Sequence, residues 1–177
     1  MNAPTKTVAE AGVLHGLKIV DAIKKAGIQY VLSVPDLHTS KGLLFPIAQD
    51  PDLKLIRVCK EDETIGISAG LSYGPKRALV LIQYTGFLYA MNAIRGVSVE
   101  YKQPTCLMIG MLGLEPGVQP QQSGKYGLRI IEPILDVMGI PHHLIESDED
   151  LSKIGPAIDE CYSKSFPVAF LIGRRPV

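Results

Sequence analysis

The sequence predicts one α/β domain over residues 1–177, a doubly wound, mostly parallel sheet of six strands with helices packed on both faces. Two observations support this fold class. Short apolar stretches alternate along the chain with segments in which apolar residues recur at helical spacing. The stretches at residues 77–84 and 105–109 are apolar at successive positions, which is typical of strands covered by helices on both sides.

The first half of the chain alternates helix and strand. Gly27 follows a segment of helical periodicity, and glycine commonly ends a helix. Acidic residues stand at the start of the third helix, where the helix dipole favours them. Pro46 is unfavourable within the second. The expected elements are a helix ending at Gly27, a strand at 30–34, a short helix at 40–49, a strand at 53–59 and a helix at 61–73.

The second half continues the alternation. Ser147 with Asp150 three residues later predicts a capping box at the start of the last helix. The Gly-, Pro- and Gln-rich segment 113–127 is expected to be a loop. The expected elements are strands at 77–84, 105–109, 142–145 and 168–172, and helices starting at Gly86, at 128–138 and after Ser147.

Composition excludes several classes of function. The chain has 18 basic and 18 acidic residues and no net charge, whereas non-specific nucleic-acid binding needs a basic surface. No apolar stretch approaches the ~20 residues of a membrane helix, and the N-terminus has no signal-peptide pattern, so we expect a cytoplasmic protein. The three widely spaced cysteines are expected to be buried or half-buried thiols.

Ligands of doubly wound sheets bind beyond the carboxyl ends of the strands, so the strand-to-helix turns are the places to search. One turn leads into Glu61, Asp62 and Glu63. These carboxylates could reach into a cleft or could simply stabilise the helix start. Gly66 and Gly70 share a face of that helix and would allow another segment to pack closely.

Two other turns carry candidate side chains. Asp36 and His38 follow the first strand, and this histidine could be an acid–base group, an anion contact or an exposed loop residue. Thr85-Gly86 predicts a tight turn after a buried strand. The aromatic residues beside it could pack under a loop or wall a cofactor ring; they are Tyr84, Phe87 and Tyr89. His142-His143 has no ligand partners at metal-binding spacing, and no phosphate-binding glycine motif is present.

These turns, in this order, resemble the pyrimidine-binding (PYR) domain of thiamine-diphosphate enzymes, especially the sulfopyruvate and phosphonopyruvate decarboxylase group. The similarity covers almost the whole chain. The matching segments are AIKKAGIQYVLSVPD, CKEDETIGISAG, QYTGFLYAMNAI, QPTCLMIGMLG and MGIPHHLI. Within them, Glu61 stands nine residues before Gly70, as the key glutamate of the family does, and Gln83, Gly86 and Asn92 are in register.

The resemblance implies a role for several residues. In the family the glutamate hydrogen-bonds N1′ of the cofactor's aminopyrimidine and favours its imino form, so Glu61 would be catalytic. It implies thiamine diphosphate binding by Glu61, Pro35, Thr85, Gly86 and Asn92. Asp36, His38 and Tyr89 would face the substrate, a 2-oxo acid that is decarboxylated. No metal ligand is expected in this chain.

The same resemblance implies a partner. Family members hold the diphosphate through Mg²⁺ on a Gly-Asp-Gly motif in a second, PP domain, and this sequence has no Gly-Asp-Gly. We therefore expect a separate PP-domain β subunit, an α2β2 or larger assembly, and pairing of PYR domains within it. The chain length favours the sulfopyruvate type, in which the α subunit carries the PYR domain.

Other functions stay open at this point. They are a decarboxylase or carboligase for phosphonopyruvate or another 2-oxo acid, a non-catalytic PYR-like regulatory subunit, and a stand-alone flavodoxin-like binding module. The chain also departs from the family pattern at Leu88-Tyr89, where relatives have Gly-Asn, and at Thr85, where Ser is usual. Lys125 and Arg129 follow the long loop and could meet a sulfonate or phosphonate or be solvated.

Overall fold

A computed structural model describes residues 12–177, and these form a six-stranded parallel sheet between two layers of helices. The fold class is therefore the expected one. The strands are β1 (Ile28–Ser33), β2 (Lys54–Arg57), β3 (Arg77–Gln83), β4 (Cys106–Gly110), β5 (His142–Ile145) and β6 (Val168–Ile172). The α-helices are α1 (Gly16–Lys25), α2 (Phe45–Gln49), α3 (Glu61–Tyr73), α4 (Tyr84–Ala93), α5 (Tyr126–Arg129), α6 (Ile131–Val137) and α7 (Ile154–Lys164).

Irregular helical turns extend several of these helices. The π-helical turns are η2 (Ser40–Leu44) and η3 (Ile94–Glu100), and the 3₁₀ turns are η4 (Pro120–Gln122) and η5 (Asp148–Lys153). The strands lie in the order β2-β1-β3-β4-β6-β5, and every neighbouring pair is parallel. Each crossover therefore needs a helix.

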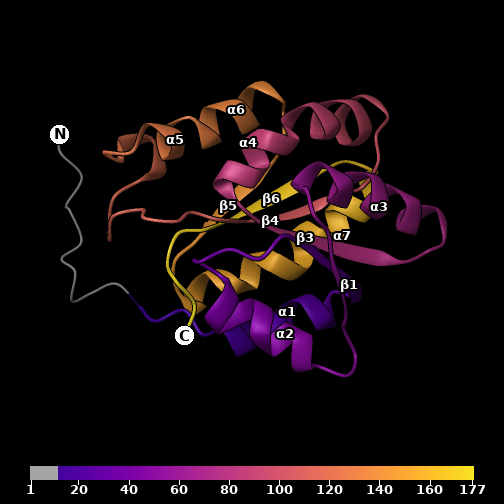
Figure 1. Cartoon of the computed structure of the whole chain (residues 1–177), viewed down its shortest axis with the longest axis horizontal. Helices are drawn as coiled ribbons and strands as arrows, with labels where there is room; N and C mark the ends of the chain where they lie inside the picture. Colours follow the sequence, from indigo (N-terminus) through magenta and orange to yellow (C-terminus); the bar gives the residue numbers. More distant parts are fainter. Residues whose placement is uncertain (1–11) are drawn as a thin grey trace.

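Two apolar cores separate the sheet from its helical layers. Figure 1 shows α1, α2 and α7 on one face of the sheet and α3, α4, α5 and α6 on the other. Ile23, Ile47 and Ile158 represent the first core, and Ile65 and Phe87 the second; all five are fully buried. β3, β4 and β6 contribute to both cores, which explains their two-sided apolar sequence.

Several expected boundaries are correct. The helix Glu61–Tyr73 and the strands His142–Ile145 and Val168–Ile172 have the predicted limits. Gly27 has φ +79° and ends α1, as expected. The capping box at Ser147 and Asp150 is present, although it opens the 3₁₀ turn η5 that leads into α7.

Other expectations need correction. The helix expected at 128–138 is two short helices, because Ile130 interrupts it and Pro133 supplies no backbone N–H. No tight turn precedes the fourth helix, because α4 begins at Tyr84 directly after β3. Cys59 is exposed, whereas Cys106 and Cys161 are buried as expected.

The two ends of the described chain meet. The Val177 N–H donates to the carbonyl of Leu14 at 3.0 Å, and its own carbonyl accepts from Gly16 at 2.9 Å. Glycine is required where these segments cross, since a Cβ on Gly16 would lie 1.5 Å from the carbonyl oxygen of Gly42, and one on Gly42 2.0 Å from that of Pro176. The contact closes the α1–α2 side of the molecule.

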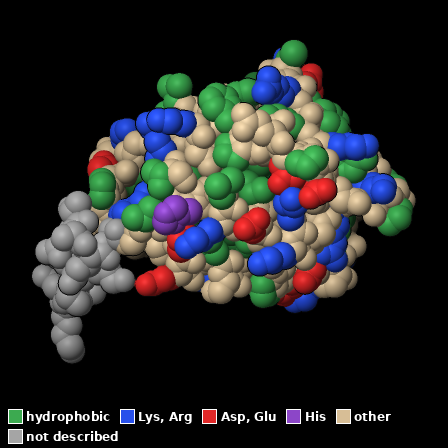
Figure 2. Space-filling view, turned by 90° about the horizontal axis from the view of Figure 1, so that it is seen from below, with side chains coloured by type: hydrophobic (Ala, Val, Ile, Leu, Met, Phe, Trp, Pro, Cys, Tyr) green, Lys and Arg blue, Asp and Glu red, His purple; other side chains and the backbone are tan. Residues whose placement is uncertain are grey.

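The surface has no broad field of one charge on the α1–α7 face, where basic and acidic side chains alternate (Figure 2). This pattern agrees with the zero net charge of the chain. None of the helices in residues 12–177 combines the length and apolar composition needed to span a bilayer.

Candidate active site

Three of the searched turns meet at the carboxyl ends of β1, β2 and β3. The chain leaves β1 toward β2 on one side and returns to β3 on the other, so the crevice above β1 and β3 is a topological switch point. A cavity of about 480 Å³ opens there. Its lining is Val34, Pro35, Asp36, Leu37, Ser40, Phe45, Glu61, Gln83 and Thr85.

Glu61 is the acidic residue that faces this cavity from the start of α3. Within residues 12–177 its carboxylate has no hydrogen-bond or ion-pair partner, and the side chain is half-buried. It lies against the first turn of α4, where a Cβ on Gly86 would come within 2.5 Å of Glu61 Cγ and 2.6 Å of Oε1. Gly86 is therefore the residue that leaves space for the Glu61 carboxyl group.

The neighbouring Glu63 performs the capping function that the sequence left open. Its Oε2 accepts from the backbone N–H of Cys59 at 3.1 Å and of Lys60 at 3.3 Å. These bonds satisfy two backbone donors at the N-terminus of α3. Since Glu63 caps α3, Glu61 is not needed for that purpose and its oxygens stay available to a ligand.

Gln83 and Thr85 line the cavity at the end of β3 and the start of α4. The Thr85 hydroxyl donates to Oε1 of Gln83 at 2.8 Å. This bond occupies the acceptor of the Gln83 side chain and leaves its amide hydrogens for another acceptor. The pair thus places a hydrogen-bond donor beside Glu61, in the same cavity.

Asp36 lines the cavity, but its carboxylate is already engaged. Oδ1 accepts from the backbone N–H of Thr39 at 3.0 Å, and Oδ2 accepts from the Thr39 hydroxyl at 2.5 Å. A third bond comes from the backbone N–H of His38. Asp36 therefore shapes the turn after β1 and, with Pro35, sets the floor of the cavity.

His38 does not share the cavity with Glu61. It is 5% exposed, and Nε2 donates to the carbonyl of Ile172 at 2.9 Å. Burial lowers its pKa, which keeps the imidazole neutral near pH 7. The alternative of an exposed loop histidine is therefore wrong, and the ring lines an adjacent cavity of about 270 Å³.

The remaining sequence-predicted residues on α4 also lie outside the cavity. Asn92 is exposed, and its Oδ1 accepts from Arg95 Nη2 at 3.0 Å. Tyr89 is exposed on the same helix. Phe87 is fully buried in the second core, and Tyr84 packs over the backbone of Gly127, so neither walls the cavity.

Sequence reasoning missed the apolar rim. Phe45 and Leu37 line the cavity and are 54% and 77% exposed. The sequence indicated this rim only in that both residues are apolar and follow the end of a predicted strand. Together they give the site an aromatic and an aliphatic edge that the protein itself leaves in contact with water.

The charge of the site is negative. Asp36 and Glu61 line the cavity, and no lysine or arginine of residues 12–177 does so. Arg129, the last residue of α5, instead donates to the carbonyls of Ser123 and Gly124 at 3.1 and 3.3 Å. In residues 12–177 no group of three His, Cys, Asp or Glu side chains is arranged to hold a metal ion.

Comparison with known proteins identifies the family. The chain is 33% identical over 158 residues to the sulfopyruvate decarboxylase subunit alpha of Methanocaldococcus jannaschii, covering 88% of this chain and 90% of that one. The chain belongs to the sulfopyruvate decarboxylase alpha-subunit family. No family model matches it.

Two further relatives agree with this assignment. The sulfopyruvate decarboxylase subunit alpha of Methanococcus maripaludis is 28% identical over 157 residues, covering 87% of this chain and 91% of its own. The sulfopyruvate decarboxylase of Methanosarcina acetivorans is 26% identical over 161 residues, which are 89% of this chain but only 40% of that longer protein. Members of this family thus exist both as alpha subunits and as part of a longer chain.

Proposed function

We propose that this chain is the alpha subunit of a cytoplasmic, thiamine-diphosphate-dependent decarboxylase that converts 3-sulfopyruvate to sulfoacetaldehyde and carbon dioxide. One observation carries the proposal: the Glu61 carboxylate lies in the switch-point cavity with no partner among residues 12–177, and Gly86 leaves the space that it occupies. The names of the relatives support the substrate.

The residues of the cavity fit the aminopyrimidine end of the cofactor. Glu61 offers an acceptor or a proton donor, the Gln83 amide a donor, and Phe45 an apolar surface for a flat ring. When bound, the cofactor supplies the carbon nucleophile and the electron sink for decarboxylation.

In this proposal the residues that line the cavity bind and orient the cofactor, and Glu61 exchanges a proton with it. Glu61 holds or releases one proton at its carboxyl group. Gln83 and Thr85 orient the ring, and Asp36 keeps the turn after β1 in place through its bonds to Thr39. Leu37 and Phe45 exclude water once the site is covered.

The proposal includes a PP-domain partner. The rim of the cavity is exposed and apolar, and the lining residues that the structure describes include no cation for a diphosphate or a sulfonate. A β subunit that covers Leu37 and Phe45 would bury that surface and bring the Mg²⁺ and the basic groups. The longer Methanosarcina acetivorans protein, of which this chain matches 40%, supports a second part of the enzyme.

The test is carbon dioxide release from 3-sulfopyruvate by the co-purified complex with Mg²⁺ and thiamine diphosphate. Glu61→Gln should lower kcat by at least about 100-fold, because proton transfer by a positioned side chain contributes about 10² to 10⁴. Glu149→Gln changes an exposed glutamate outside the site and should leave the rate unchanged.

Two results would overturn the proposal. Full activity of Glu61→Gln in the complex would indicate a non-catalytic, regulatory subunit. A complex that releases carbon dioxide from phosphonopyruvate or pyruvate but not from 3-sulfopyruvate would be a decarboxylase with a different substrate.

A further inference from the structure

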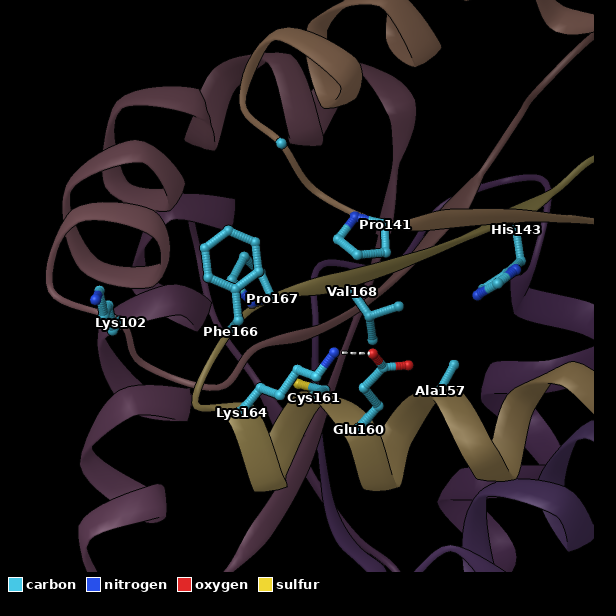
Figure 3. A pocket seen from close by; sticks show the side chains of 11 residues that line it. Lys102, Pro141, His143, Ala157, Glu160, Cys161, Lys164, Phe166, Pro167 and Val168 are labelled. Carbon is cyan, nitrogen blue, oxygen red and sulfur yellow. Dashed lines mark hydrogen bonds and ion pairs between the residues drawn. The ribbon is translucent and has the colours of Figure 1, made fainter.

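A second cavity lies at the opposite edge of the sheet, at the amino ends of β5 and β6. Its volume is about 460 Å³, within the range of about 300 to 1,000 Å³ of small-molecule sites. Figure 3 shows it as a trough above α7. Its lining is Lys102, Gly139, Pro141, His143, Ala157, Glu160, Cys161, Lys164, Phe166, Pro167 and Val168.

The walls of this cavity are largely apolar. Phe166, Pro167 and Pro141 lie on the strand side in Figure 3, and Ala157 and Cys161 lie on the side of α7. Cys161 is buried, and its Sγ lies 3.5 Å from that of Cys106 behind it. An apolar body would therefore meet side chains on both sides of the trough.

The ionisable groups of the cavity add up to one positive charge. Glu160 and Lys164 form an ion pair at 2.5 Å and neutralise each other. His143 is half-buried against Phe170, and burial lowers its pKa, so the ring is neutral near pH 7. Lys102 has no hydrogen-bond or ion-pair partner in the part of the chain that the structure describes, and its ammonium group stays uncompensated.

Lys102 is also held in an unusual backbone conformation. Its φ of +52° is in the left-handed region that side-chain-bearing residues seldom adopt. The turn is fixed on both sides, because Tyr101 N–H donates to Gly96 O at 3.0 Å and Gln103 N–H to Val97 O at 3.3 Å. Figure 3 places the Lys102 side chain at one end of the trough, where it borders the apolar walls.

We propose that this trough is a binding site for a small organic anion with one negative charge and an apolar or aromatic body. The anionic group would pair with Lys102, and the body would lie between Phe166 and the apolar side chains of α7. The site uses no residue of the switch-point cavity, so it would be an effector site rather than part of the substrate site.

The probe is 8-anilinonaphthalene-1-sulfonate, an aromatic monoanion that becomes fluorescent in apolar surroundings. The full chain should bind one equivalent. Lys102→Glu should weaken binding by about fivefold, because an exposed ionic contact becomes a repulsion. Lys41→Glu is the matched control: this exposed lysine lines the groove between α1 and α2, and its reversal should change binding by less than about twofold.

A second readout follows stability. The urea unfolding midpoint of the full chain should rise when the probe is present, because the probe binds the folded state, and Lys102→Glu should reduce that rise. Ala157→Trp should fill the trough and abolish binding of the probe. Lys102→Glu should keep the native circular dichroism spectrum, so that its weaker binding is not caused by unfolding.

Three outcomes would overturn the proposal. They are equal effects of Lys102→Glu and Lys41→Glu, an unchanged urea unfolding midpoint with the probe present, and loss of probe binding when the partner subunit is added. The last result would mean that another protein, rather than a small anion, occupies the trough.

Discussion

Replacing Gly86 by alanine would move the Glu61 carboxyl group without removing it. The new Cβ would lie 2.5 Å from Glu61 Cγ and 2.8 Å from Cδ. Carbon atoms pack at about 3.5 to 4.0 Å, so the side chain must shift by about 1 Å. A displacement of that size at a reacting group costs about 100-fold in rate.

The stability effect should be small. Gly86 lies in the first turn of α4, and alanine favours a helix over glycine by up to about 1 kcal/mol. Glu61 is half-buried and has no hydrogen bond from its carboxylate within residues 12–177, so it can rotate away without breaking one. We expect the free energy of unfolding to change by less than about 1 kcal/mol.

The assay is kcat/KM for 3-sulfopyruvate in the reconstituted complex, measured beside urea unfolding of the isolated chain. Gly155→Ala is the matched control, since a Cβ at that position on α7 meets nothing within 4 Å. A Gly86→Ala protein with native activity would refute the contact argument. A protein that loses activity only in proportion to its unfolding would refute it as well.

Four further predictions concern stability, measured by urea unfolding. Tyr162→Phe removes a hydroxyl that accepts from Ala78 N–H at 2.7 Å and donates to its carbonyl, and should cost about 1–3 kcal/mol; a neutral result would show that water replaces it. Ser147→Ala should cost about 1 kcal/mol through the lost cap, and an unchanged midpoint contradicts this. Burial lowers the folded-state pKa of His38, so the free energy of unfolding should fall as pH drops below 6.5. His38→Gln should make this pH dependence shallower, and the part that remains should come from His143, whose pKa is also lowered by burial. The His15 N–H and the Lys18 ammonium hold the pKa of Asp148 well below its usual 3.8, so its contribution is present above that pH and lost below it; an Asp148→Asn protein with the native acid slope would disprove the assignment.

The fold was predictable because its determinants are local. β3 and β4 are apolar at successive positions, and only a sheet with helices on both faces buries such strands completely. The π-helical turns η2 and η3 were not predictable. Their hydrogen-bond pattern depends on how the segment packs after a strand or helix ends, and no residue type specifies it.

The site was predictable in part. The turns that form it follow from the topology, since carboxyl ends of parallel strands meet at one edge. The family register singled out Glu61, but the direction of the Glu63 side chain was not predictable, because both residues lie in the first turn of the same helix. His38 is fixed by a bond to Ile172, 134 residues away, and such a contact leaves no local trace in the sequence.

The pairing of Val177 with Leu14 and Gly16 makes the described polypeptide nearly a closed ring. A ring can be opened at another point. A gene that joins these two segments through a short linker and begins at the exposed Pro116-Gly117 turn would encode the same six strands in a permuted order. In this protein the spatial arrangement of the sheet can therefore be separated from the order in which its elements are synthesised.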